Sequence, residues 1–277
     1  MSRFVVLGTA RTGTSLVCSL LDSHPDVTCP GEVFVLGRGR LPVLERKGLG
    51  MRETYVKWLR GGPLRQLRHA LGPARAGAVA DYLTDFFTGS EVSARGFKLL
   101  VTQTLQLPGI VPWLQAHDVR VIRVARRNLL KTWVSREVKR RTRRATARDA
   151  VPLTTVRADV EAMLAKLAWM EDEQRAVDEL LAGQPSLRVV YETLQADLEG
   201  ESRRMLRFLG VDAGVPVSTP YVKTNPECLA DVVENYAEVA AALAGTPWER
   251  HLDAAGGSAA DAAAGRSPSG APRGATP

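Results

Sequence analysis

The first 22 residues constrain the fold of this chain more than any other segment. A short apolar run, Phe4–Leu7, leads through the glycine-bounded octapeptide Gly8–Ser15 (GTARTGTS) into Thr14–Asp22, where apolar residues recur with helical periodicity. A buried strand followed by such a turn and a helix N-terminus brings backbone N–H groups and the positive end of the helix dipole to one point. The segment therefore predicts a P-loop-like strand–loop–helix unit that binds phosphate.

The rest of the body alternates between strand-like and helix-like segments. This alternation predicts an α/β fold, in which a single domain has a mostly parallel central sheet flanked by helices. We expect the domain to span residues 1–253. Residues 254–277 are nearly all small, with glycine, serine and proline, so we expect a disordered tail there. The predicted strands are Phe97–Val101, Val119–Val124 and Leu187–Val190, and the predicted helices are Val156–Leu181 and Gly200–Leu209.

The loop differs from the loop of nucleoside triphosphatases at one position. It matches the pattern G-x-x-x-x-G-K-[ST] except that Thr14 replaces the lysine that reaches the β- and γ-phosphates, while Arg11 places a cation inside the loop. The strand VRVIRV is followed by Ala125, Arg126 and Arg127, where such enzymes usually place an aspartate that holds Mg²⁺. The three cysteines and four histidines show no metal-ligand spacing. The sequence therefore predicts a phosphate ligand bound without a metal.

One segment carries most of the positive charge. Ten arginines and two lysines stand against a single glutamate between Arg120 and Arg148, although the whole chain has a net charge of only +7. Such a segment usually indicates an anionic partner. Ser135 follows Arg127 by eight residues, and a helix that begins near Asn128 would bring both side chains to one phosphate. Two separate phosphate sites, here and at the loop, suit a nucleotide with phosphates at both ends of its ribose.

These motifs resemble those of the sulfotransferases that use 3′-phosphoadenosine 5′-phosphosulfate (PAPS). Their 5′-phosphosulfate loop is similar to Ala10–Val17 (ARTGTSLV), and their 3′-phosphate motif of an arginine and a serine eight residues later is similar to Arg127 and Ser135. Their Y-E-[DT]-L segment resembles Tyr191–Leu194, and a late K-x-N-P segment resembles Lys223–Pro226. The matches occur in family order over nearly the whole predicted domain.

The resemblance also suggests the type of sulfotransferase. Cys29–Phe34 (CPGEVF) resembles the P-x-E-x-F segment of bacterial carbohydrate-type and protein-tyrosine-type members, whose glutamate is the base. The catalytic histidine and the R-K-G motif of the animal cytosolic enzymes have no match, and Lys223–Asn225 is the proposed substitute for R-K-G. The resemblance implies cofactor contacts from Arg11, Thr12, Gly13, Thr14, Ser15, Leu16, Arg127, Ser135, Tyr191, Lys223, Thr224 and Asn225.

The activity implied is transfer of the sulfuryl group of PAPS to a hydroxyl or amine of a small molecule or carbohydrate. Glu32 would accept the acceptor proton, and Arg11 would stabilise charge on the transferring group. No metal is expected. Two alternatives stay open: an atypical nucleotide kinase with a P-loop, and a non-enzymatic anion or nucleic-acid binder that uses residues 120–148. The second lacks an aromatic stacking platform and leaves the N-terminal loop unexplained, so we do not expect a nucleic-acid partner.

The sequence also bears on location and assembly. No stretch approaches the roughly 20 apolar residues of a membrane-spanning helix, and the apolar run at the N-terminus is too short for a signal peptide. We therefore expect a cytoplasmic protein. The identity of the acceptor and the oligomeric state, including a homo-oligomer, are left open.

Overall fold

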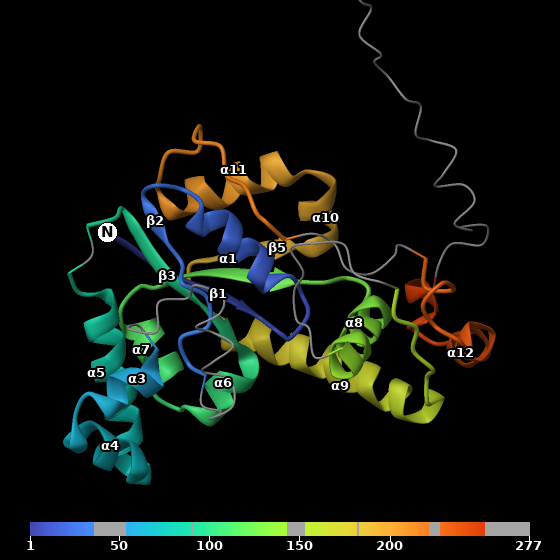
Figure 1. Ribbon diagram of the computed structural model, residues 1–277, viewed down its shortest axis with the longest axis horizontal. Coiled ribbons are helices and arrows are strands. Elements are labelled where there is room, and N and C mark those ends of the chain that lie inside the picture. The colour runs from blue at the N-terminus through green and yellow to red at the C-terminus, as the bar shows by residue number, and fades with distance from the viewer. Residues whose placement is uncertain (36–53, 90, 143–152, 182, 222–227, 253–277) are drawn as a thin grey trace, which may run out of the picture.

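The computed structural model of the chain describes residues 1–35, 54–89, 91–142, 153–181, 183–221 and 228–252. Its centre is a five-stranded sheet in which every pairing is parallel, with the strand order β2-β3-β1-β4-β5 (Figure 1). The predicted α/β fold with a parallel central sheet is confirmed. The strands are β1 (Ser2–Gly8), β2 (Val27–Thr28), β3 (Ala94–Leu100), β4 (Arg120–Ala125) and β5 (Ser186–Val190).

Helices connect the strands and cover both faces of the sheet. They are α1 (Thr14–Asp22), α3 (Tyr55–Arg60), α4 (Pro63–Ala70), α5 (Arg75–Phe87), α6 (Val101–Gln106), α7 (Ile110–Ala116), α8 (Leu129–Thr142), α9 (Val160–Leu180), α10 (Tyr191–Ala196), α11 (Leu198–Leu209) and α12 (Tyr236–Leu243), with 3₁₀ turns at Gly72–Ala74 and Glu249–His251. In Figure 1, α1 and α11 lie on one side of the sheet and α7 and α9 on the other.

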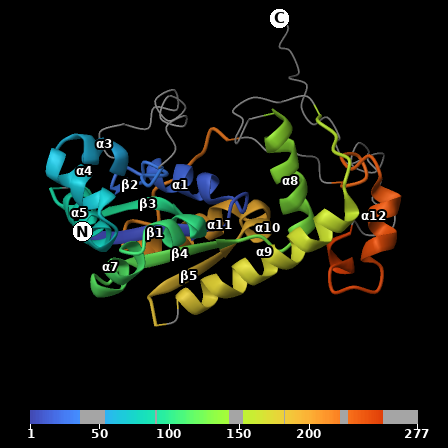
Figure 2. The same ribbon diagram turned by 90° about the horizontal axis from the view of Figure 1, so that it is seen from below.

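The side chains of β1 show how the layers are built. Phe4 and Val6 are buried under α1 and α11, whereas Val5 and Leu7 are buried under α5 and α7. This alternation follows from the two-residue period of a strand that is covered on both faces. A third apolar cluster joins α8, the first half of α9 and α12, which lie together at the opposite end of the molecule from α4 (Figure 2).

Most predicted elements are present, with shifted ends. The helix predicted over Val156–Leu181 begins only at Val160, because Asp159 caps it by accepting a hydrogen bond from the Ala162 amide. The helix predicted from Gly200 begins two residues earlier, after the capping residue Asp197. The strand predicted over Phe97–Val101 begins at Ala94 and ends at Leu100, since Val101 is the first residue of α6.

Two further predictions concern membrane-spanning helices and the C-terminal tail. Within the described ranges, no helix is both long enough and apolar enough to cross a bilayer. The predicted tail, residues 254–277, lies outside the described residues.

Candidate active site

The candidate site lies at the edge of the sheet where the strands end. The chain passes from β1 to β2 and β3 on one side and then to β4 and β5 on the other, so the loops after β1 and β4 diverge beside each other. In open parallel sheets this switch point is where ligands bind. The predicted loop follows β1, Arg126 and Arg127 follow β4, and Tyr191 follows β5. The topology thus brings the predicted residues from three strands to one edge.

The loop after β1 is shaped by two glycines. A Cβ atom at Gly8 would lie 2.8 Å from the carbonyl oxygen of Val124, and one at Gly13 would lie 2.5 Å from the ring of Tyr191. Gly13 also has a φ of 97°, a left-handed conformation that favours glycine. It stands at the N-cap of α1 with no side chain to satisfy the amides of the first turn. An anion is the natural partner for a helix N-terminus of this kind.

The other loop side chains have separate surroundings. Thr12 is buried and donates a hydrogen bond of 2.8 Å to the carbonyl oxygen of Thr9, which holds the loop closed. Thr14 is buried too, with its methyl group toward Gly8. Leu16 packs against the apolar cluster under α1. These residues shape the loop, whereas Arg11 and Ser15 extend from it to other elements.

Arg11 joins the loop to α8. Its Nε donates a hydrogen bond of 2.9 Å to the Oγ of Ser135, 124 residues away, so the structure places two predicted binding residues in contact. Its φ of 73° is unusual for a residue other than glycine. Burial lowers the pKa of Arg11 from its usual value, and the charge of Arg126 lowers it further. A cation in this setting is stabilised by an anionic ligand.

Arg126 and Tyr191 pack next to Arg11 and form with it one wall of the site. The Arg126 guanidinium lies 4.8 Å from the centre of the Tyr191 ring and donates to the carbonyl oxygen of Arg11 at 3.4 Å. Burial lowers the pKa of Arg126 and raises that of Tyr191. The Arg126 Nε is buried without a hydrogen-bond partner among the described residues. Buried polar atoms rarely stay unpaired in proteins, so this donor also fits a site that takes a ligand.

Arg127 is exposed beside this wall and is fixed by the segment after β5. Its amide and that of Asn128 donate to the two carboxylate oxygens of Glu192 at 3.0 and 3.1 Å, and its Nη2 donates to the Oγ1 of Thr193 at 3.1 Å. Asn128 caps α8 by accepting from the Lys131 amide. The helix start predicted near Asn128 is therefore confirmed, and Glu192 and Thr193, two residues of the motif Tyr191–Leu194, hold Arg127 in place.

Glu32 lies in a second polar group at the same edge. Its Oε1 accepts from the Nζ of Lys98 at 2.7 Å, and the same Nζ donates to the Oγ of Ser15 at 3.1 Å. A parallel bridge between Glu32 and Lys98 fixes the backbone, and the Lys98 amide donates to the carbonyl oxygen of Gly31 at 2.8 Å. Both side chains are largely buried. The Glu32 carboxylate is thus joined through Lys98 to Ser15 at the start of α1.

Lys98 is a further site residue that was not predicted from the sequence. It stands inside the apolar run Phe97–Val101, where a lysine is costly unless its charge is paired. A charged residue inside an apolar strand can indicate a site residue, but Arg123 inside β4 shows the same pattern. Arg123 points away from this group and binds Asp178 and the carbonyl oxygen of Gln174, and burial lowers its pKa to about 10. Only the structure separates the two.

The arrangement can bind an anionic ligand at two places. Arg11, Arg126 and Ser135 form the first, joined by the bonds of Arg11 to Ser135 and of Arg126 to the Arg11 carbonyl oxygen, whereas the Arg127 side chain is bonded to Thr193. The start of α1 with Ser15 and Lys98 forms the second, beside the carboxylate of Glu32. No group of three or more metal-ligating side chains occurs among the residues that the structure describes. The predicted residues Lys223, Thr224 and Asn225 lie outside the described residues.

Comparisons with known proteins bear on the family of the chain. Residues 3–214 match the sequence model described as "Sulfotransferase family". No curated protein matches the chain. Among solved structures, the chain is similar to a sulfotransferase from Alicyclobacillus acidocaldarius, with a TM-score of 0.44 and 15% identity over 92% of this chain and 97% of that one. It is also similar to the sulfotransferase domain of the Synechococcus PCC 7002 olefin synthase, with a TM-score of 0.43 and 18% identity over 92% and 89%.

Proposed function

The chain belongs to the sulfotransferase family, and we propose that it transfers the sulfuryl group of PAPS to a hydroxyl or amine of a small molecule or carbohydrate with Glu32 as the base. The observation that carries this proposal is the connected group Glu32–Lys98–Ser15, which joins a carboxylate to the phosphate loop through one lysine. The reaction needs a proton acceptor close to an anion-binding loop, and Lys98 bonds to both Glu32 and Ser15.

PAPS supplies a sulfuryl group attached to a phosphate leaving group. The chain holds both anionic ends of PAPS, the phosphosulfate and the 3′-phosphate. The start of α1, Ser15 and Lys98 bind the phosphosulfate end, where negative charge develops on the leaving oxygen. Arg127 and Ser135 bind the 3′-phosphate, with Arg11 between the two ends through its hydrogen bond to Ser135. Tyr191, stacked against the loop at Gly13, contacts the nucleotide.

The transfer step forms one bond, breaks one bond and moves one proton. The acceptor oxygen or nitrogen attacks sulfur, the bond from sulfur to the bridging phosphate oxygen breaks, and 3′-phosphoadenosine 5′-phosphate (PAP) leaves with the electron pair. Glu32 takes the acceptor proton. Lys98, held at 2.7 Å from Glu32, keeps the carboxylate in place until the acceptor binds. Positioning and charge stabilisation supply most of the catalysis in loose transfers of this type.

The direct test is incubation with ³⁵S-labelled PAPS and a panel of phenols, sugars, alcohols and amines. We expect PAP to form together with a labelled product for at least one acceptor, at a rate that EDTA does not change. Consumption of ATP·Mg²⁺ with no turnover of PAPS would contradict the proposal and would favour the nucleotide kinase.

A further inference from the structure

Helix α4 turns its leucines outward. Leu64, Leu67 and the capping residue Leu71 share one face, as the spacing i, i+3, i+7 requires, and they are 73%, 54% and 53% exposed. No residue of α4 is buried. Single exposed leucines are common, but a whole apolar face in water is not. The exposed leucines therefore make this face a candidate docking surface.

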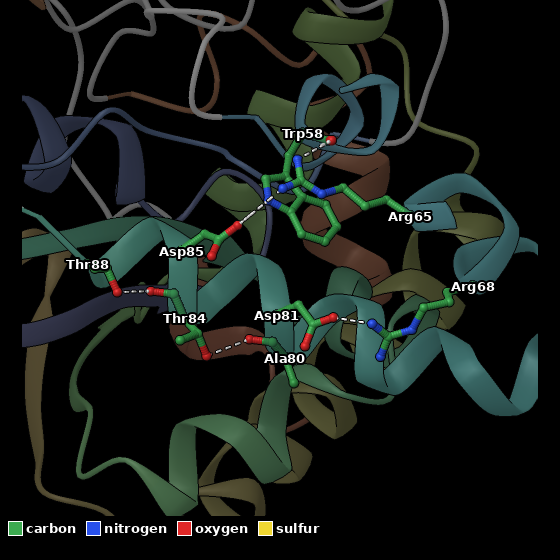
Figure 3. A network of polar contacts seen from close by, with 8 residues as sticks. All are labelled: Trp58, Arg65, Arg68, Ala80, Asp81, Thr84, Asp85 and Thr88. Carbon is green, nitrogen blue, oxygen red and sulfur yellow. Dashed lines mark hydrogen bonds and ion pairs between the residues drawn. The ribbon is translucent and has the colours of Figure 1, made fainter. Parts of the chain in front are cut away.

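The charged face of α4 packs against the protein instead. Arg68 forms an ion pair with Asp81 of α5, and Arg65 lies over the ring of Trp58 at 4.2 Å and pairs with Asp85 at 3.7 Å. Figure 3 shows Arg68 extending toward Asp81 and Arg65 lying along Trp58, which in turn donates to Asp85. An amphipathic helix usually turns its apolar face inward and its charged face outward, and α4 has the reverse arrangement.

These contacts hold α4 in one orientation. His69 adds a hydrogen bond of 3.0 Å between its Nδ1 and the hydroxyl of Tyr55, whose ring is fully buried, and Arg75 donates to the carbonyl oxygen of His69 at 3.0 Å. The end of the Arg68 side chain also lies against Gly77 of α5. The outward leucines are therefore a fixed feature of the fold.

The surroundings of the leucines are positively charged. Residues 54–80 contain Lys57, Arg60, Arg65, Arg68 and Arg75 and no acidic residue. Lys57 and Arg60 are exposed on α3, the helix next to α4. Asp81 and Asp85 are held by Arg68 and Arg65, so the outer rim keeps its positive charge. A leucine face next to a helix that carries exposed cations fits a partner that is apolar within and anionic at its surface.

We propose that α4 docks on a membrane surface containing anionic lipids. The leucines would enter the boundary between headgroups and acyl chains while Lys57 and Arg60 contact lipid phosphates. Helix α4 lies at an outer corner of the molecule in both views, so a flat surface can reach it (Figures 1 and 2). The inference does not depend on the transfer reaction.

Two features favour a membrane over a protein partner. Stable protein interfaces bury about 800 Å² on each side, and three leucines on an eight-residue helix offer only a fraction of that. A second copy of the chain across a two-fold axis would also bring Lys57 and Arg60 toward their own equivalents. A lipid surface has neither problem, because it deforms around a few side chains and carries the opposite charge.

The test is co-sedimentation of the full chain with vesicles of phosphatidylcholine alone and of phosphatidylcholine with phosphatidylglycerol. We expect binding to the anionic vesicles only, weakened by salt, and a loss of roughly tenfold or more in partition coefficient for Leu64→Ser/Leu67→Ser and for Lys57→Glu/Arg60→Glu. Matched controls are Leu105→Ser, on an 81% exposed leucine of α6, and Arg203→Glu/Arg207→Glu on exposed positions of α11. Both controls are expected to bind as the unchanged chain does.

Four results would overturn the proposal. Absence of binding to the anionic vesicles, or equal binding by the leucine variant, would remove the membrane as the partner. A concentration-dependent dimer in light scattering that the leucine variant abolishes would assign the face to a second copy. A fall of several degrees in Tm for the leucine variant but not for Leu105→Ser would show that the face is packed within the chain.

Discussion

Replacing Glu32 with glutamine is expected to lower kcat about 10²–10⁴-fold, the usual contribution of a general base. The amide keeps the size of the side chain, and its oxygen can still accept the hydrogen bond from Lys98. It cannot take the acceptor proton at neutral pH. Folding and nucleotide binding should therefore persist while the transfer step fails. Steady-state turnover with the best acceptor measures the loss, and calorimetric titration with PAP measures what remains.

The matched control for this change is Glu199→Gln, which removes an exposed carboxylate on α11 that pairs with Arg203. Its turnover should equal that of the unchanged chain. PAP affinity of the Glu32 variant should stay within about threefold, because Glu32 reaches the loop only through Lys98. A turnover near that of the unchanged chain would show that Glu32 serves only as the counter-ion of Lys98 and that another group is the base.

Replacing Arg127 with alanine is expected to weaken PAP binding about 10- to 100-fold, since a charge-assisted hydrogen bond contributes roughly 1.5–3 kcal/mol. The guanidinium is exposed at the site edge and already oriented by its bond to Thr193 Oγ1, so little freedom is lost when a phosphate binds. AMP, which lacks the 3′-phosphate, should bind the variant nearly as well as it binds the unchanged chain. The ratio of the two affinities is the quantity to measure.

Arg140→Ala is the matched control, because it removes the same charge from an exposed position of the same basic segment. It should leave both affinities nearly unchanged. An equal loss of PAP and AMP binding in the Arg127 variant would mean that Arg127 acts through the general positive field or through the 5′-phosphate. The assignment of the 3′-phosphate would then be wrong.

Local patterns were enough to predict the framework of the fold. The strand, loop and helix of the first 22 residues are where the sequence predicts them, because period-two burial, a glycine turn and helical periodicity are all signals between near neighbours. Helix ends were less accurate, since Asp159 and Asp197 as caps decide them. The strand β2 was not predicted, because two residues are too few to show a pattern.

The site was predicted as separate motifs, and their contacts were not. Nothing local in the sequence indicates that Arg11 bonds Ser135, 124 residues away, or that Tyr191 rests on Gly13. Such contacts arise because parallel strands distant in the chain end at the same edge of the sheet. Lys98 was overlooked for the same reason, since its partners Glu32 and Ser15 come from two other elements.

The central claim is that the site at the ends of β1, β4 and β5 binds a nucleotide with phosphates on both the 3′ and 5′ positions. The most direct measurement is calorimetric titration with PAP, with AMP and ATP·Mg²⁺ as controls. We expect PAP to bind with micromolar or tighter affinity and both controls to bind far more weakly. Equal affinity for the three nucleotides, or no binding of PAP, would contradict the account.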